Sequence, residues 1–278
     1  MWQNRFFTIF GLSVWILLSF HPPIYAIVDP LAVPNNKYGI HIIDENDLEN
    51  AVSLVNSSRG DFGYVTFVVT IADRNIEKWS KTFKRLEEFH LIPILRIATQ
   101  SQGNFWEKPK EEDAQTWRDF LSQLPWFTQN RYIVLFNEPN HSQEWGNEIN
   151  PREYARILKT YSMSLKTKSE DFFILGAGLD ASAPNGKATM DEVTFLREMI
   201  SEEPDIFSYI DGFASHSYPN PGFSGKPTDV GRGTLRTYRW EKQVLTSLGM
   251  TRNLPTFITE TGWAHKEGIP FRADYYSA

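Results

Sequence analysis

Two glutamates that each come one polar residue after a short apolar run are the first candidates for chemistry. Glu138 follows the run YIVLF within Asn137-Glu138-Pro-Asn-His, and Glu260 follows TFI within Thr-Glu260-Thr-Gly-Trp. A carboxyl group at the inner end of a buried strand is costly unless it is solvated, paired or protonated. Glycoside hydrolysis needs two carboxyl groups that flank one bond, one to protonate the leaving oxygen and one ionised. Either glutamate alone is equally well explained as an exposed loop carboxylate, but the pair indicates acid–base chemistry on a sugar.

Strand-like and helix-like segments alternate along the chain and must position these glutamates. Most of the apolar runs are continuous, as expected for parallel strands that are buried on both faces. The runs that predict strands are Tyr38–Ile43, Gly63–Thr70, Ile92–Ala98, Arg131–Glu138, Phe172–Gly178, Ile210–Tyr218 and Pro255–Gly262.

Helical patterns lie between several of these runs. Apolar residues recur at spacings of three and four from Ile76 to Phe89, which predicts an amphipathic helix. Asn150-Pro151-Arg152-Glu153 predicts a helix start, with Asn as the N-cap and Pro at the first helical position. Further helices are predicted over Leu48–Val55, Asp113–Leu124 and Leu235–Leu248.

The polar strand ends decide which kind of parallel sheet is expected. Alternating strands and helices predict either a closed barrel or a doubly wound open sheet. In a barrel, the chemistry collects at the C-terminal ends of the strands. Five of the predicted strands carry ionisable or hydrogen-bonding side chains at or near their C-terminal ends: His41, Arg96, Asn137 with Glu138, His216 with Tyr218, and Glu260. We therefore expect the α/β class and a TIM-type (β/α)8 barrel; seven strands are visible, and we expect that truncation removes the eighth.

The motifs around these strand ends resemble the clan of retaining (β/α)8 glycoside hydrolases that includes the cellulase-like family 5 and xylosidase-like family 39 enzymes. Those enzymes carry an acid/base glutamate in an Asn-Glu-Pro motif after strand four and a nucleophile glutamate after strand seven. The resemblance implies that Glu138 is the acid/base, that Glu260 is the nucleophile, and that Asn137 binds the sugar 2-hydroxyl. His216 and Tyr218 match the His-x-Tyr pair after strand six, whose tyrosine holds the nucleophile.

Other candidate binding residues follow this resemblance less closely. Family 5 enzymes place an arginine on strand two, whereas the nearest match here is Arg96 on the third predicted strand. Trp263 stands in for the stacking tryptophan that the clan supplies from strand eight. For two residues the sequence allows two interpretations. His41 either lines the site or fills the barrel floor, and Trp145 either stacks on a sugar or packs in the core.

The composition excludes several other classes of function. Among 278 residues, 28 Lys and Arg against 34 Asp and Glu give a net charge of −6, which argues against nucleic-acid binding. There is no cysteine, which excludes disulfides, thiolate metal sites and a cysteine nucleophile. The histidines show no HExxH spacing. We therefore expect neither a metal nor a cofactor.

The N-terminal 26 residues have the layout of a signal peptide. Arg5 precedes an apolar run from Phe6 to Phe20, and Ala26 follows a helix-breaking stretch as the expected end of the leader. The run is shorter than the ~20 residues that span a bilayer, although an uncleaved membrane anchor remains the alternative. We expect an exported protein with one barrel domain over residues 27–278.

These observations together predict a retaining glycosidase that acts on a β-linked oligo- or polysaccharide, with the carbohydrate as its partner. Two alternatives stay open. A non-catalytic carbohydrate-binding or cell-surface barrel could keep the same cleft. A transglycosylase would use the same two glutamates and differ only in the acceptor, a sugar instead of water.

Overall fold

A computed structural model describes residues 27–264 with the exception of 31, 36, 58 and 59. The expected signal peptide, and the segment after residue 264 that bears on an eighth strand, lie outside the described residues. The strands are β1 (Gly39–His41), β2 (Gly63–Thr70), β3 (Leu91–Ala98), β4 (Arg131–Leu135), β5 (Phe172–Gly176), β6 (Phe213–His216) and β7 (Thr256–Glu260). The α-helices are α1 (Leu48–Val55), α2 (Ile76–Glu88), α3 (Asp113–Gln123), α4 (Pro151–Lys166), α5 (Glu192–Glu202) and α6 (Thr237–Ser247).

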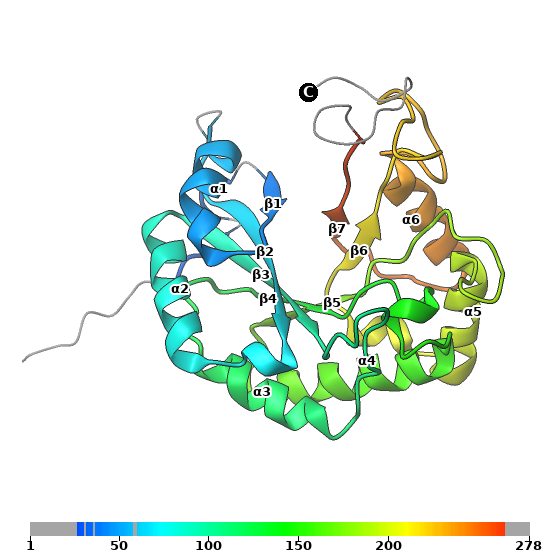
Figure 1. The fold of residues 1–278 in the computed structure, drawn as a ribbon, viewed down its shortest axis with the longest axis horizontal. Helices are drawn as coiled ribbons and strands as arrows, with labels where there is room; N and C mark the ends of the chain where they lie inside the picture. The colour runs from blue at the N-terminus through cyan, green and yellow to red at the C-terminus, as the bar shows by residue number, and fades with distance from the viewer. Residues whose placement is uncertain (1–26, 31, 36, 58–59, 265–278) are drawn as a thin grey trace, which may run out of the picture.

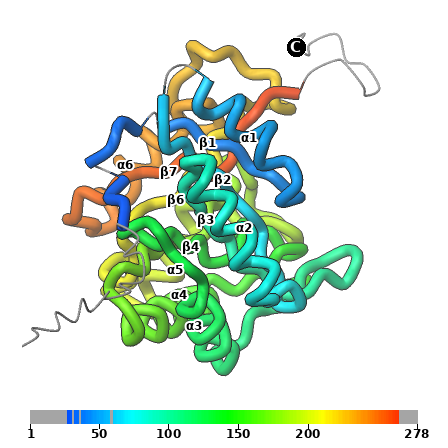
Figure 2. Tube along the Cα trace, turned by 90° about the vertical axis from the view of Figure 1, so that its left-hand side faces the viewer, coloured from blue at the N-terminus to red at the C-terminus, as the bar shows by residue number. Residues whose placement is uncertain are grey.

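The strands lie side by side in the order in which they occur in the sequence. Strands β1 to β5 form one parallel sheet, and β6 and β7 form a parallel pair. A parallel bridge between Leu175 and Gly212 joins the end of the first sheet to the second. The helices cover the outer side of the strands, and α1 and α2 lie outside β1–β3 (Figures 1 and 2). The described residues thus form a partial TIM-type barrel with seven strands, which confirms the predicted fold class.

The barrel is open between its first and last described strands. Strands β1 and β7 face each other across the opening in Figure 1. Within the described ranges no strand pairs with the outer edge of either one. A cavity of about 870 Å³ lies there, lined by β1, by β7 and by inward-facing side chains of β2 to β5 such as Tyr132 and Phe173.

Alternation along the strands sorts side chains between two apolar layers. Ile92, Ile94, Tyr132 and Val134 pack inside the barrel, whereas Leu95 and its outward-facing equivalents pack against the helices. Because side chains in a strand alternate, Arg96 follows Ile94 onto the inner face and is brought to the end of the barrel. The sequence pattern of β3 therefore already determines that this guanidinium points inward.

Most predicted strands and helices are confirmed, and many of them are shorter than predicted at one or both ends. Helix α4 begins after Asn150, whose side chain accepts a hydrogen bond from the Glu153 backbone N–H at 3.0 Å. Helix α5 was not predicted, although Asp191 caps it by accepting from the Thr194 N–H. No helix in the described part of the chain is both long and apolar enough to cross a membrane.

Candidate active site

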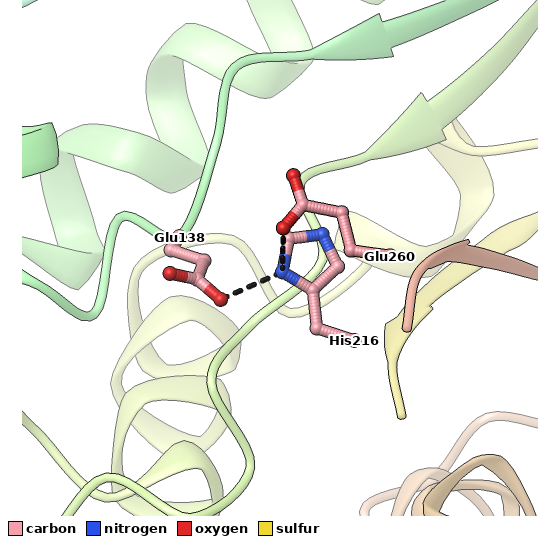
Figure 3. Close-up of side chains that lie close together, drawn as sticks. All are labelled: Glu138, His216 and Glu260. Carbon is pink, nitrogen blue, oxygen red and sulfur yellow. Dashed lines mark hydrogen bonds and ion pairs between the residues drawn. The ribbon is translucent and has the colours of Figure 1, made fainter. Parts of the chain in front are cut away.

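Glu138 and Glu260, far apart in the sequence, meet at one ring nitrogen of His216. Nδ1 of His216 lies 2.7 Å from Oε1 of Glu138 and 3.7 Å from Oε2 of Glu260 (Figure 3). One oxygen of each carboxyl group and one ring nitrogen all lie within 4.8 Å of one another. The imidazole side chain is only 2% exposed, whereas each carboxylate side chain is 20% exposed. The carboxylates therefore face a space that solvent or substrate can enter, and the histidine is fixed behind them.

The backbone after β4 explains how two adjacent side chains enter the same site. A regular strand would point Asn137 and Glu138 to opposite faces. Instead, Phe136 has φ of 74° and Glu138 has φ of 29°, both on the left-handed side that non-glycine residues rarely adopt. The Phe136 ring is held edge-to-face by Trp145 and Tyr161 at 6.0 and 5.3 Å. Aromatic packing thus maintains a strained turn of the kind found at functional sites.

Glu260 accepts hydrogen bonds from two side chains of other strands or strand ends. Nη1 of Arg96 donates to Oε1 of Glu260 at 2.9 Å and also donates to the Asn137 side-chain oxygen. The Tyr218 hydroxyl donates to Oε2 of Glu260 at 3.1 Å. Such charge-assisted hydrogen bonds are stronger than neutral ones, and these groups are mostly shielded from water. They fix the orientation of the Glu260 carboxylate and stabilise its negative charge.

Burial and neighbouring charges shift the titration of the groups around the two glutamates. Desolvation is the largest cause that lowers the pKa of His41, and the positive charge of Arg96 adds to it. Burial raises the pKa of Tyr218 above its usual range, and the charge of Glu260 raises it further. The tyrosine therefore stays protonated and remains a hydrogen-bond donor to Glu260.

A histidine–aspartate pair lies on the Glu138 side of the site. Nε2 of His141 is 3.0 Å from Oδ2 of Asp180, and this hydrogen bond is the main cause that raises the pKa of His141. Asn140 is fully buried and binds Asp180 through two side chain–backbone hydrogen bonds. The loops after β4 and β5 are thereby joined directly behind Glu138.

Glu144 is a third carboxyl group that sequence reasoning missed. It lies in a 3-10 turn (Ser142–Glu144) and hydrogen-bonds to the side chain of Asn137. Burial is the main cause that raises its pKa, the Asn137 side chain and the Arg96 charge partly oppose the shift, and the negative charges of Glu138 and Glu260 add to it. No sequence signal marks Glu144, because it follows no strand and belongs to no motif.

The two predicted tryptophans have different outcomes. Trp145 is fully buried, and its Nε1 donates to Oε2 of Glu153 on α4 at 2.9 Å. Its ring packs edge-to-face on Phe136 and Tyr154, so no face is left for a sugar and the binding interpretation is corrected to a core role. Trp263 is 36% exposed and its Nε1 donates to the Gly225 carbonyl, which places it against the loop after β6.

The same central group has the side-chain types that bind metals. Among the described residues, Glu138, His216 and Glu260 are the group whose ligand atoms lie close enough to share an ion. The Arg96 guanidinium beside Glu260 opposes a divalent cation at this place. The arrangement suits acid–base chemistry between two carboxyl groups better than metal chemistry.

No protein-family model and no curated protein matches this chain. Solved structures do resemble it. A monomeric β-xylosidase from Caulobacter crescentus CB15 has 13% sequence identity and a TM-score of 0.56, with 86% of this chain and 54% of that chain covered. A GH39 enzyme from Xanthomonas axonopodis pv. citri has 14% identity and a TM-score of 0.54, with 86% and 53% covered. A family 51 α-L-arabinofuranosidase from Bifidobacterium longum has 11% identity and a TM-score of 0.55, with 90% and 60% covered.

These likenesses concern the fold. The chain spans between about half and three fifths of the length of these solved structures. The described residues have the partial barrel, and the motif-bearing strand ends of that barrel meet at one place. The resemblance to the (β/α)8 glycoside hydrolases is thus confirmed at the level of the fold, and this chain has the fold of that clan.

Proposed function

We propose that this chain is a retaining glycosidase in which Glu138 is the general acid/base and Glu260 the nucleophile. The observation that carries the proposal is the placement of both carboxyl groups around His216, with one oxygen from each within 4.8 Å of a shared ring nitrogen. The fold supports it, since the similar solved structures include a β-xylosidase and an α-L-arabinofuranosidase.

The separation of the carboxyl groups favours retention over inversion. Retaining glycosidases have their two carboxyl groups about 5–5.5 Å apart, whereas inverting enzymes need about 6.5–9.5 Å to admit a water molecule. One carboxyl oxygen of Glu138 lies within 4.8 Å of one carboxyl oxygen of Glu260, which is nearer to the shorter range. Glu260 would attack the anomeric carbon while Glu138 protonates the leaving oxygen, and Glu138 would then deprotonate the water that releases the sugar.

The neighbouring side chains have roles that follow from their contacts. Arg96 and Tyr218 would hold the Glu260 carboxylate in line for attack. His216 would orient Glu138 through its 2.7 Å contact. Asn137, fixed by Arg96, would bind a sugar hydroxyl. We also propose export of the protein, which places the enzyme where extracellular carbohydrate is available.

A panel of aryl β-glycosides and polysaccharides tests the proposal, with Glu138→Gln and Glu260→Gln as inactive references. Proton NMR of the first product formed should show the same anomeric configuration as in the substrate. Binding without turnover would favour the non-catalytic barrel. Turnover that yields longer sugars in place of reducing ends would favour the transglycosylase, and initial inversion would remove the double displacement.

Loss of the Tyr218 hydroxyl should weaken catalysis more than binding. Tyr218→Phe removes one hydrogen bond to the Glu260 carboxylate and leaves the ring contact with Phe223. A hydrogen bond to a charged group is worth about 1.5–3 kcal/mol, so kcat should fall about 10- to 100-fold. Steady-state kinetics on the best panel substrate measure the effect. Tyr209→Phe, which removes an exposed hydroxyl bonded to Asp205, is the control and should keep full activity.

A further inference from the structure

Glu144 and Trp106 are joined into one rigid unit beside the two central glutamates. The backbone N–H of Trp106 donates to the Gln143 carbonyl at 2.7 Å, and the N–H of Gly146 donates to the Trp106 carbonyl at 2.8 Å. These two bonds bracket Glu144 in the chain. The loop after β3 and the loop after β4 are therefore tied together at the point where the Glu144 carboxyl group lies.

A small hollow separates this unit from the catalytic pair. Its volume is about 20 Å³, and Arg96, Thr99, Trp106, Asn137 and Glu144 are among its lining residues. A single water molecule needs about 10–15 Å³ on this measure. The hollow therefore has room for one hydroxyl-sized substituent and not for a sugar ring.

The polar groups around the hollow match a hydroxyl. Arg96 and Asn137 carry N–H donors, and Glu144 supplies carboxylate acceptors. A hydroxyl group can donate to the carboxylate and accept from a guanidinium or amide at the same time. Trp106 also lines the hollow, and an indole ring suits the apolar C–H surface of a sugar.

The fold gains little from a carboxylate at this position. Asn137 and the Arg96 charge favour the ionised form of Glu144, yet its desolvation outweighs them, and the charges of Glu138 and Glu260 add to that penalty. Both effects penalise its ionised form in the folded protein. Glutamine has nearly the same shape and would avoid the cost of burying a charge, so the fold itself does not require a carboxylate at this position.

We propose that Glu144 is a substrate-binding residue that accepts a hydrogen bond from one sugar hydroxyl held in this hollow, next to the bond that is cleaved. This inference rests on the proposed glycosidase function. It makes Glu144 a determinant of which sugar is accepted, because an epimer that points this hydroxyl elsewhere leaves the carboxylate desolvated and unpaired.

Glu144→Gln tests the proposal, with Glu148→Gln as a matched control in the following loop. Glu148 is exposed and pairs with Lys108 outside the site. The Glu144 variant should raise KM about 10-fold on the best aryl glycoside of the panel, because a charged acceptor is replaced by a neutral amide oxygen that makes a weaker bond. Its melting temperature should stay equal or rise, and the control should match the wild type in every measurement.

A series of monodeoxy aryl glycosides identifies the hydroxyl. The wild type should lose affinity sharply at one deoxy position, and Glu144→Gln should show no further loss at that position. Wild-type binding should also weaken as pH falls, because protonation removes the carboxylate, and the variant should lose this dependence.

Two results would overturn the assignment. One is an unchanged KM and an unchanged deoxy pattern in Glu144→Gln. The other is a loss of kcat that follows a loss of stability, since that would make the role structural. Isothermal titration with the parent monosaccharides separates failure of the proposed function from failure of this inference. If no glycoside is cleaved but a sugar binds, the variant must still bind it more weakly.

Discussion

Replacing either central glutamate by alanine should reduce turnover by at least about 10³-fold, and sodium azide should restore activity in two different ways. Glu260→Ala removes the proposed nucleophile and leaves a space that a small anion can enter. Azide would then attack the anomeric carbon of a β-glycoside from that face and give the α-glycosyl azide in a single inversion. The side-chain volume that is lost and the adjacent Arg96 cation both favour the anion.

Glu138→Ala removes the proposed acid/base and should give the opposite product. An aryl glycoside with a good leaving group needs little protonation, so Glu260 still forms the glycosyl-enzyme. Without Glu138 no base activates water to attack the glycosyl-enzyme. Azide needs no base, and it attacks the anomeric carbon from the face opposite Glu260, which gives the β-glycosyl azide. The two azides are distinguished by their anomeric proton couplings in NMR.

Glu198→Ala on α5 is the control, because its carboxylate pairs with Arg152 on the outer side of the barrel. It should retain turnover and form no azide. If the two active-site variants gave azides of exchanged configuration, the roles of Glu138 and Glu260 would have to be exchanged. If neither variant lost activity, the glycosidase proposal itself would be wrong.

A buried pair of carboxyl groups should make the protein less stable as pH rises. Glu192 at the start of α5 and Glu241 on α6 are both 0% exposed, and their four carboxyl oxygens have no hydrogen-bond partner of good geometry among the described residues. Burial raises the pKa of Glu241 to about 7, although the Ser215 and Glu192 side chains partly oppose the shift. Burial, followed by repulsion from Glu241, raises the pKa of Glu192 well above its usual value.

The direction of the effect follows from proton linkage. Between the ordinary glutamate pKa of 4.5 and the raised value of about 7, the folded protein holds a proton that the unfolded chain has released. The Glu241 contribution to folding stability is therefore unaffected below about pH 4.5, falls as pH rises through this window and levels off above it, and the raised pKa of Glu192 acts in the same direction. A shift of this size corresponds to about 3 kcal/mol for Glu241.

Glu241→Gln should remove this penalty, since glutamine stays neutral and its amide can donate to Glu192. We expect the variant to be more stable than the wild type by about 3 kcal/mol at pH 8, or roughly 6–12 °C in Tm, with little difference at pH 4. Thermal unfolding followed by circular dichroism across pH 4–8 measures the expected difference at pH 8 and its absence at pH 4. Glu198→Gln on the same helix α5 as Glu192 should follow the wild-type curve. A Glu241→Gln curve parallel to the wild type would show that the pair carries no extra proton.

Much of the local structure is predictable from the sequence because it depends on contacts between near neighbours. The N-cap of Asn150, the apolar face of α2 and the alternation that turns Arg96 inward all follow from residues within a few positions. Helix α5 was missed although its cap and apolar spacing are present, because a loop rich in Pro and Gly precedes it. The strand ends that carry Glu138 and Glu260 are also readable, since each follows an apolar run.

Positions that depend on distant segments were not predictable in the same way. Trp145 looked free to bind a sugar, yet α4 and the Phe136 ring enclose it completely. No local pattern marks Glu192 or Glu241 as buried, yet both side chains are fully enclosed in the folded protein. Burial of a side chain depends on what covers it, and the covering residues lie far away in the chain.

The sequence alone determined the parallel strand–helix pattern, the placement of the chemistry-bearing residues at strand ends and the pairing of Glu138 with Glu260 as candidates. The tertiary structure decided that His216 stands between these carboxylates, that Arg96 and Tyr218 hold one of them, and that Glu144 joins the site. The physical reason is that periodicity fixes the direction of a side chain relative to its own strand. Only the order and curvature of the strands, together with left-handed residues such as Phe136, fix which of those directions converge on one point.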